Sequence, residues 1–395
     1  MVIKCKIHTM YHEYTDKMKQ IQNSFLEFLE KEDNIEENYQ NLTKLIKDQK
    51  IEDNQLELKS FLHLISKIAK NHYRNPNFFD KIKQILQIIK NSINNFFTNE
   101  EIFEFFEKSQ HILLFLVEEK VFRIDESIFA KMLKNESLAN FFKPELQSFS
   151  KEDKEKDQDI DLEEYNEKRK IGENDSYLCK IIREDSIEDF IIYVNKNDQF
   201  SLNSYIEKSV FETHSILNGQ EVKLIDYAAF FGSVQIFKYL YLNGVALTKA
   251  LWIYGIHGDN PEIIDILKEN EITPEDSSYQ KCMKEAIKCH HNGIANYILN
   301  NLLQEEEFYV DDKFFRNLTC YSFHYYNFSF FPKEPNHRFI FFYACYYDYL
   351  NIVQFLFQTK KIDVKEKIIY IYLFCSILFF FIDSNVFGNI QKRTI

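Results

Sequence analysis

One group of cysteines and histidines in this sequence has the residue types of a metal site: Cys282, Cys289, His290 and His291. Thiolates and imidazoles are the usual ligands of zinc, normally in closely spaced pairs. On a helix, Cys282 and Cys289 lie two turns apart, too far for one ion, and two adjacent histidines point in different directions. We therefore interpret these residues as structural thiols and a histidine in a turn, and predict no metal site.

Other residues that could do chemistry are equally isolated. The acidic runs Glu305–Glu307 and Asp311–Asp312 lie in polar stretches, where a solvated surface is expected rather than acid–base catalysis. The phosphate-binding pattern GxxxxGK[ST], the dinucleotide pattern GxGxxG and the nucleophile pattern GxSxG are all missing from the sequence. We expect no catalytic residues and no cofactor, and hence a protein that is not an enzyme.

Composition favours a helical protein. The 395 residues include 45% hydrophobic and 28% charged residues, which is typical of a globular chain, and only 8 glycines and 6 prolines. Few turn formers disfavour a many-stranded fold and favour helices with short links. The net charge of −13 argues against nucleic acid or anionic lipid as a general partner, although local basic patches stay open.

The cysteines indicate an intracellular location. They are odd in number, scattered and without a CxxC pair, as expected for reduced thiols. The first residues, MVIKCKIHTMYHEY, contain no apolar stretch long enough for a signal peptide. We expect a cytoplasmic protein, with the nucleus as an alternative.

Residues 1–148 are predicted to form amphipathic helices. Met18, Ile21, Phe25 and Leu29 recur at helical spacing, and the segment from Thr98 to Glu101 has the form of a capping box. Whether these helices form a bundle or an irregular solenoid stays open. Residues 149–173 are highly charged and are interpreted as a solvated linker or an exposed helix, with an acidic docking segment as the alternative.

A repeated pattern begins near residue 174. The segments Lys223–Leu242 and Phe339–Phe357 align without a gap, and Lys249–Leu267 and Lys281–Leu299 follow the same pattern. Each segment has small residues in a first helix, a turn residue, and then paired apolar residues in a second helix. The turn residues are Gly232, Gly258, His290 and Asp348. Such a helix pair cannot bury its own apolar face, so the units must stack.

These residues resemble ankyrin repeats, whose pattern is TPLHxAAxxG followed by a second apolar helix. More narrowly, residues 174–364, with motifs such as LIDYAAFFGSVQIFKYLYLNG and FFYACYYDYLNIVQFL, resemble an ankyrin-containing domain of unknown function that is expanded in some protozoa. The resemblance implies an all-α chain in which a helical solenoid of irregular repeats follows the N-terminal helices. It departs from the family where KLID, KALW and KCMK replace TPLH, so the hydrogen bonds of that motif are lost or substituted. The long interval before Asp348 hides a degenerate unit around residues 311–330, or an insertion.

The resemblance also implies a binding surface. In ankyrin arrays the residues between the small pair and the turn line a concave groove, and in this chain eight residues fall there: Phe230, Phe231, Ile256, His257, Lys288, Cys289, Tyr346 and Tyr347. Aromatic rings in a groove are typical of an interface with a protein partner. The alternative is that the N-terminal helices fold over these side chains and make them core.

The C-terminal tail, residues 365–395, contains the uncharged run Ile368–Ile382. A membrane span needs about 20 apolar residues, so a buried helix closing the stack is favoured over an anchor. The function expected from the sequence is a non-catalytic protein–protein interaction module. The alternatives are a membrane-tethered adaptor and an enzyme within the first 145 residues.

Overall fold

The structure is a computed structural model, and it describes residues 2–72, 75, 77–147, 161–197, 199–219, 221–275, 278–303, 312–333 and 337–358. Over these residues the expected all-α fold is confirmed, since the chain folds into helices with one isolated bridge between Tyr205 and Lys223. The predicted tail at 365–395, with its apolar run, lies outside the described residues. None of the described helices is long and apolar enough to cross a membrane.

The chain forms two compact bodies. The smaller contains the described residues within 1–14 and 333–358, and the larger contains those within 15–332. Helix α1 (Val2–Glu30) begins in the smaller body and continues into the larger. In the smaller body, α22 (His337–Tyr346) packs against α23 (Leu350–Gln358), and Tyr14 makes an edge-on ring contact with Phe355 at 6.1 Å.

Amphipathic helices fill the first part of the larger body, as predicted. They are α2 (Ile35–Asp48), α3 (Gln55–Asn71), α4 (Phe78–Phe96), α5 (Asn99–Phe106), α6 (Gln110–Glu118), α7 (Glu126–Leu133), α8 (Glu136–Phe141) and α9 (Lys143–Gln147), with the short 3-10 helix η1 (Ile51–Asp53) before α3. The capping box is confirmed, because Thr98 and Glu101 each accept a backbone hydrogen bond from the other. Met18, Ile21, Phe25 and Leu29 are all buried, so one face of α1 lies in the core.

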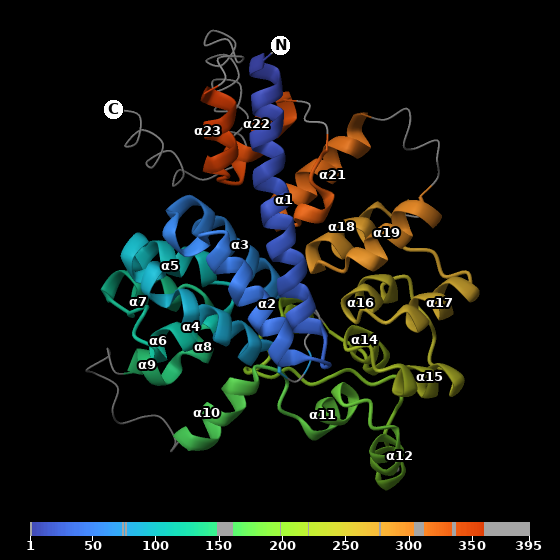
Figure 1. Ribbon diagram of the computed structural model, residues 1–395. Coiled ribbons are helices and arrows are strands. Elements are labelled where there is room, and N and C mark those ends of the chain that lie inside the picture. The colour runs from blue at the N-terminus through green and yellow to red at the C-terminus, as the bar shows by residue number, and fades with distance from the viewer. Residues whose placement is uncertain are drawn as a thin grey trace. The chain divides into compact units, whose positions relative to one another are not determined.

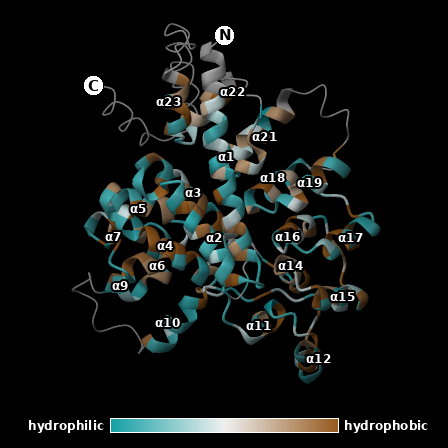
Figure 2. Cartoon of the chain, viewed as in Figure 1, coloured by the Kyte–Doolittle hydropathy of each residue, from teal (hydrophilic) through white to brown (hydrophobic). Residues whose placement is uncertain are grey.

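The predicted charged linker ends in a helix, α10 (Leu162–Ile171), which Figure 2 draws mostly in the hydrophilic colour. One of its charges is nevertheless buried. Both terminal nitrogens of Arg169 lie 2.7 Å from the two carboxylate oxygens of Glu145, and Arg169 is 5% exposed. A bidentate pair of this kind holds α10 to the N-terminal helices. The chain therefore does not divide into compact bodies at residues 149–173, where the linker was expected.

Paired helices form the rest of the larger body (Figure 1). The inner members are α11 (Tyr177–Arg183), α14 (Leu224–Phe230), α16 (Leu251–His257) and α18 (Gln280–Cys289), and the outer members are α12 (Ile187–Lys196), α15 (Val234–Leu242), α17 (Pro261–Glu269) and α19 (Asn292–Asn301). A short helix, α13 (Ser215–Gly219), lies in the longer connection before α14. The inner helices contact one another in chain order, and each outer helix packs on its own inner partner. All seven residues of α14 are buried, because it is covered on both sides.

Left-handed residues end the inner helices. Gly232, His290 and Asp348 have positive φ, as their turn positions predict, whereas the predicted turn at Gly258 lies one residue later, at Asp259. The next amide after several of these residues bonds back to the helix, as in Ser233 N to Ala228 O and His291 N to Ala286 O. The shift follows from one extra residue in this unit, since Ile236 lies four residues after Gly232 whereas Ile263 lies five residues after Gly258.

A ladder of side-chain hydrogen bonds joins successive pairs. In each pair the residue after the left-handed position bonds to a carbonyl near the end of the preceding inner helix. The bonds are Ser233 Oγ to Ile182 O, Asn260 Nδ2 to Gly232 O, His291 Nδ1 to Ile256 O and Asn327 Nδ2 to Ile287 O. These residues supply inter-unit hydrogen bonds in a chain that lacks the TPLH motif.

The interval before Asp348 contains a degenerate unit. Helix α21 (Asp312–Tyr325) packs on α18, the left-handed residue is Tyr326, and Asn327 makes the ladder bond. In place of a second helix there is one 3-10 turn, η2 (Phe328–Phe330). Of the two predicted possibilities, a degenerate unit is the one that the structure contains.

Candidate functional site

The structure buries most of the predicted groove. Phe230, Phe231, Ile256, His257 and Cys289 are each 5% exposed or less, and Lys288 is half-buried. Helix α3 of the N-terminal region contacts α18 beside Cys289, whereas His214 and Arg183 lie against the rings of Phe230 and Phe231. The remaining two residues, Tyr346 and Tyr347, lie on α22 and at its end, in the smaller body, where Tyr346 is 43% exposed.

Buried polar contacts hold the N-terminal helices in place. His72, at the end of α3, has Nδ1 at 2.7 Å from the carbonyl oxygen of Cys289. Gln22 of α1 donates to Asn327 Oδ1 and accepts from the amide of Phe328. Hydrogen bonds of this kind fix the register of two packed surfaces, because each unmatched buried group would lose its partner. The end of α18 and the start of η2 therefore form an internal interface with the N-terminal helices.

Within this interface lies a group that we call the His257 cluster, made of His257, Glu285 and Cys289. Nε2 of His257 lies 2.7 Å from Oε1 of Glu285, and Sγ of Cys289 lies 3.4 Å from Nδ1 and 3.7 Å from Nε2 of the same ring. Glu285 and Cys289 are one turn apart on α18, and His257 ends α16. Phe230 stacks on the imidazole with centroids 4.9 Å apart.

The charges of the cluster are balanced internally. Burial by itself raises the pKa of Glu285, but hydrogen bonds and charges from His257 and Lys288 outweigh it and hold that pKa at about 2. Nζ of Lys288 lies 2.6 Å from the Glu285 carboxylate. Burial, and then the charge of Glu285, raises the pKa of the Cys289 thiol well above its ordinary value. At neutral pH the carboxyl is ionised and the thiol is protonated.

The cluster has the connectivity of a cysteine nucleophile, a histidine base and an acid, but not the geometry. A nucleophilic thiol needs an in-plane nitrogen lone pair, a lowered pKa and access to substrate. Sγ of Cys289 is nearly as far from Nδ1 as from Nε2 of His257. If it lay in the plane of the ring at these distances, it would be closer to Cε1 than van der Waals contact allows, so it lies over the face of the ring. Cys289 is also fully buried, with 0% exposure. This arrangement gives the thiol no base and no substrate.

The cluster also has the residue types of a metal site. Among the described residues, His257, Glu285 and Cys289 are the group whose candidate ligand atoms lie within 4.8 Å of one another. A metal bound by the imidazole lies in the ring plane, whereas the sulfur lies over its face, and the carboxylate is already bonded to Lys288. The residues therefore do not fit a tetrahedral ion as they stand.

The four cysteine and histidine residues noted in the sequence do not converge. Cys289 belongs to the His257 cluster, while His291 makes a ladder bond and Nε2 of His290 lies 3.4 Å from the carbonyl of Tyr326. Cys282 is buried in the apolar core between the helix pairs. The interpretation as structural thiols and a histidine in a turn agrees with these positions.

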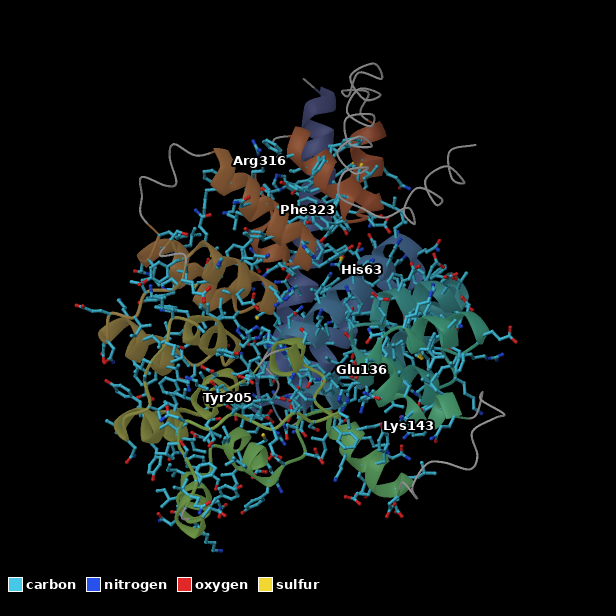
Figure 3. All side chains as sticks on the ribbon, turned by 180° about the vertical axis from the view of Figure 1, so that it is seen from behind. His63, Glu136, Lys143, Tyr205, Arg316 and Phe323 are labelled. Atoms are coloured by element: carbon cyan, nitrogen blue, oxygen red, sulfur yellow. The ribbon has the colours of Figure 1, made fainter. Side chains whose placement is uncertain are left out.

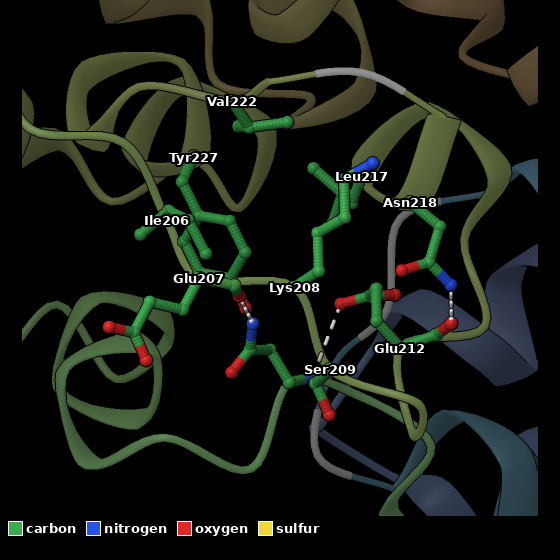
Figure 4. A pocket seen from close by; sticks show the side chains of 10 residues that line it. Ile206, Glu207, Lys208, Ser209, Glu212, Leu217, Asn218, Val222 and Tyr227 are labelled. Atoms are coloured by element: carbon green, nitrogen blue, oxygen red, sulfur yellow. Dashed lines mark hydrogen bonds between the residues drawn. The ribbon is translucent and has the colours of Figure 1, made fainter.

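A small pocket lies between the N-terminal end of the paired helices and the loop before α13 (Figure 4). Its polar groups already bond to one another. Glu212, which is 2% exposed, accepts from the amides of Asn174 and His214, and Asn174 Nδ2 donates to the carbonyl of Glu207 at 2.6 Å. Little space is left, so the pocket is a closed structural network and not a ligand site.

No family model, no curated protein and no solved structure matches this chain. Sequence reasoning missed Glu285, His72 and Gln22. Glu285 has a detectable signal, since it lies four residues before Cys289 on one helix face. His72 and Gln22 have none, because their partners lie hundreds of residues away along the chain.

Proposed function

We propose that this chain is a non-catalytic protein–protein interaction module built on ankyrin-type repeats. What supports the repeat assignment is the recurring left-handed turn, the chain-order stacking of inner helices, and the ladder from Ser233 to Asn327. An intracellular location goes with the proposal, because five of the cysteines are free thiols: Cys179, Cys282, Cys289, Cys320 and Cys345.

The observation that carries the binding role is an exposed aromatic face on α22. Phe342 is 40% exposed and Tyr346 is 43% exposed, and their rings stack with centroids 6.3 Å apart at an interplanar angle of 11°. The positions of Tyr346 and Tyr347 correspond to Phe230 and Phe231 in the repeat register, which are covered in the larger body. Large rings in contact with water are costly unless a partner covers them, and tyrosine is a frequent interface anchor.

A double substitution tests the binding role. Phe342→Ser and Tyr346→Ser together should leave far-UV circular dichroism and Trp252 fluorescence unchanged, because each residue is about two-fifths exposed to solvent. A photo-crosslinking amino acid at Tyr346 should capture a defined protein, and the same probe at Leu242 should not. Leu242 is the matched control, since it is 78% exposed on α15. Identical capture from both positions, or unfolding of the double variant, would show that the α22 face is not a docking surface.

A further inference from the structure

Five lysines lie on elements that contact one another, since α3 packs on α5 and α18, and α18 packs on α21. We call them the lysine cluster: Lys67 and Lys70 on α3, Lys108 in the turn, and Lys284 and Lys288 on α18. Lys108 is exposed and the other four are half-buried. The gathering is unexpected in a chain with a net charge of −13.

Three contacts hold the elements of the cluster together. Ser66 Oγ donates to the carbonyl of Phe105 at 2.5 Å, which fixes α3 to α5. His72 contacts the carbonyl of Cys289 at the end of α18. His63, which is labelled in Figure 3, stacks on Tyr326 at the end of α21, with centroids 4.8 Å apart. On α3, His63, Lys67 and Lys70 share one helix face, so the lysines meet at these contacts.

Carboxylates neutralise only part of this charge. Lys288 pairs with Glu285, and Lys108 approaches Glu107 at 4.0 Å. Among the described residues no acidic side chain forms an ion pair with Lys67, Lys70 or Lys284. Burial, followed by the charges of Lys108 and Lys70, lowers the pKa of Lys67 to about 8. Burial and then the charges of Lys108 and Lys288 also lower the pKa of Lys70.

Favourable interaction with a helix dipole accounts for the positions of only two of the five lysines. Lys70 and Lys288 lie in the last turns of α3 and α18, where a cation is favourable. Lys67, Lys108 and Lys284 gain less from a dipole, and Lys67–Lys70 and Lys284–Lys288 are like-charge pairs on one helix face, which destabilise a helix. Lys288 is offset by its ion pair with Glu285, and Nζ of Lys284 lies 5.6 Å from the centroid of the Tyr321 ring, so the repulsion is least compensated at Lys67 and Lys70 among the described residues.

A neighbouring polar atom also lacks a partner. Nε2 of His63 is buried and has no hydrogen-bond partner in the described chain. Burial and the charges of Lys59 and Lys67 lower the pKa of His63 to about 3, so its ring is neutral at physiological pH. A buried nitrogen without a partner is uncommon in a folded protein, and in the tautomer that carries the proton on Nε2 it could donate to a phosphate oxygen.

We propose that the lysine cluster binds a small anion that carries phosphate groups. Several converging ammonium groups suit a phosphate better than a carboxylate, because its charge is larger and spread over more oxygens. Half-burial favours a compact ligand that replaces the water around Lys67 and Lys70. A nucleic-acid strand needs a basic stripe along its length, whereas these lysines lie on a few neighbouring helices of an acidic protein.

The test uses the full chain at constant ionic strength, with tripolyphosphate, inorganic phosphate, ATP and sodium sulfate as probes. Tripolyphosphate should raise the Tm saturably, and sulfate should not. Lys67→Gln with Lys70→Gln should abolish this shift. The matched control is Lys44→Gln with Lys47→Gln, an exposed pair at the same spacing on α2, which should keep it. A tighter dissociation constant for ATP than for tripolyphosphate would place the phosphate on a nucleotide, and equal values would indicate free polyphosphate.

The unliganded variants give a second readout. Lys67→Gln with Lys70→Gln should have a Tm equal to or above that of the wild type, since it removes mutual repulsion. Three results would overturn the proposal: an equal shift with sulfate, an unchanged shift in the Lys67/Lys70 variant, or tighter binding of a single-stranded RNA than of tripolyphosphate. A lower Tm of the unliganded variant would also overturn it, because the lysines would then be structural.

Discussion

Gly232 and Gly258 lie back to back across two successive turns, with no room for a side chain on either. A Cβ on Gly258 would lie 2.1 Å from the carbonyl oxygen of Ala229 and 2.7 Å from the amide nitrogen of Gly232. A Cβ on Gly232 would lie 2.5 Å from the carbonyl oxygen of Gly258. The spacing between α14 and α16 is therefore set by backbone contact.

This contact predicts a large effect for Gly258→Ala. The methyl group meets backbone that cannot rotate away, so we expect a loss of about 3 kcal/mol in the free energy of unfolding, measured by urea denaturation. Gly219→Ala is the control, because nothing lies within 4 Å of its Cβ position. It should change stability by less than about 1 kcal/mol. Equal effects of the two substitutions would contradict the packing described for Gly232 and Gly258.

The bond between Gln22 and Asn327 predicts that the N-terminal helices and the paired helices unfold together. Trp252, the only tryptophan, is fully buried in α16 and donates to the carbonyl of Ile272. Its fluorescence transition should coincide with that of far-UV circular dichroism. Gln22→Ala and Asn327→Ala should each shift both transitions, with a coupling energy of about 1–2 kcal/mol in a double-mutant cycle. Separate transitions, or additive effects, would mean that α1 is not bound to η2 in solution.

Buried neutral histidines predict acid sensitivity. Burial, with a smaller contribution from His72, lowers the pKa of His290 to about 3 and that of His291 well below 6.5, and His63 behaves similarly. Below pH 6.5 these histidines become protonated in the unfolded chain but stay neutral in the folded chain, so the free energy of unfolding falls as the pH falls. Asp259, Asp226 and Glu104 oppose this, since burial raises the pKa of each carboxyl, that of Asp259 to about 6.

The substitution His63→Phe removes one of these titrating histidines and so measures its contribution to the pH dependence of stability. The new ring can keep the stacking on Tyr326 and the edge contact with Phe105. Between pH 6 and pH 4.5 the free energy of unfolding should fall less steeply in the variant than in the wild type. The difference between the two slopes should be about 1.4 kcal/mol per pH unit. Urea denaturation at several pH values measures the slope. Parallel slopes for the two proteins would show that His63 titrates normally in the folded chain.

The position of Cys289 predicts an unreactive thiol. Its sulfur is buried over the His257 ring and its pKa is raised by burial. Iodoacetamide at pH 8 should alkylate it about a thousandfold more slowly in the native chain than in urea, because opening a core costs about 4 kcal/mol or more. Peptide mass spectrometry gives the rate at this position. Fast native labelling would restore Cys289 as a candidate nucleophile.

Helices and turns were predictable from the sequence because they depend on residues close together in the chain. The capping box at Thr98, the apolar face of α1 and the left-handed residues at Gly232 and His290 all follow from local spacing. The degenerate unit was partly predictable. Its interval was detected, but the turn at Tyr326 was not, since a tyrosine gives no turn signal.

What covers the inner helices was decided only by the tertiary structure. His72 and Cys289 are 217 residues apart, and Gln22 and Asn327 are 305 apart, so no local pattern pairs them. The same holds for His257 and Glu285, and for Lys67 and Lys288, which come from different helices. An amphipathic pattern determines that a helix has a face to bury. Which surface meets that face depends on packing and hydrogen-bond matching between distant segments, and these exist only once the chain has folded.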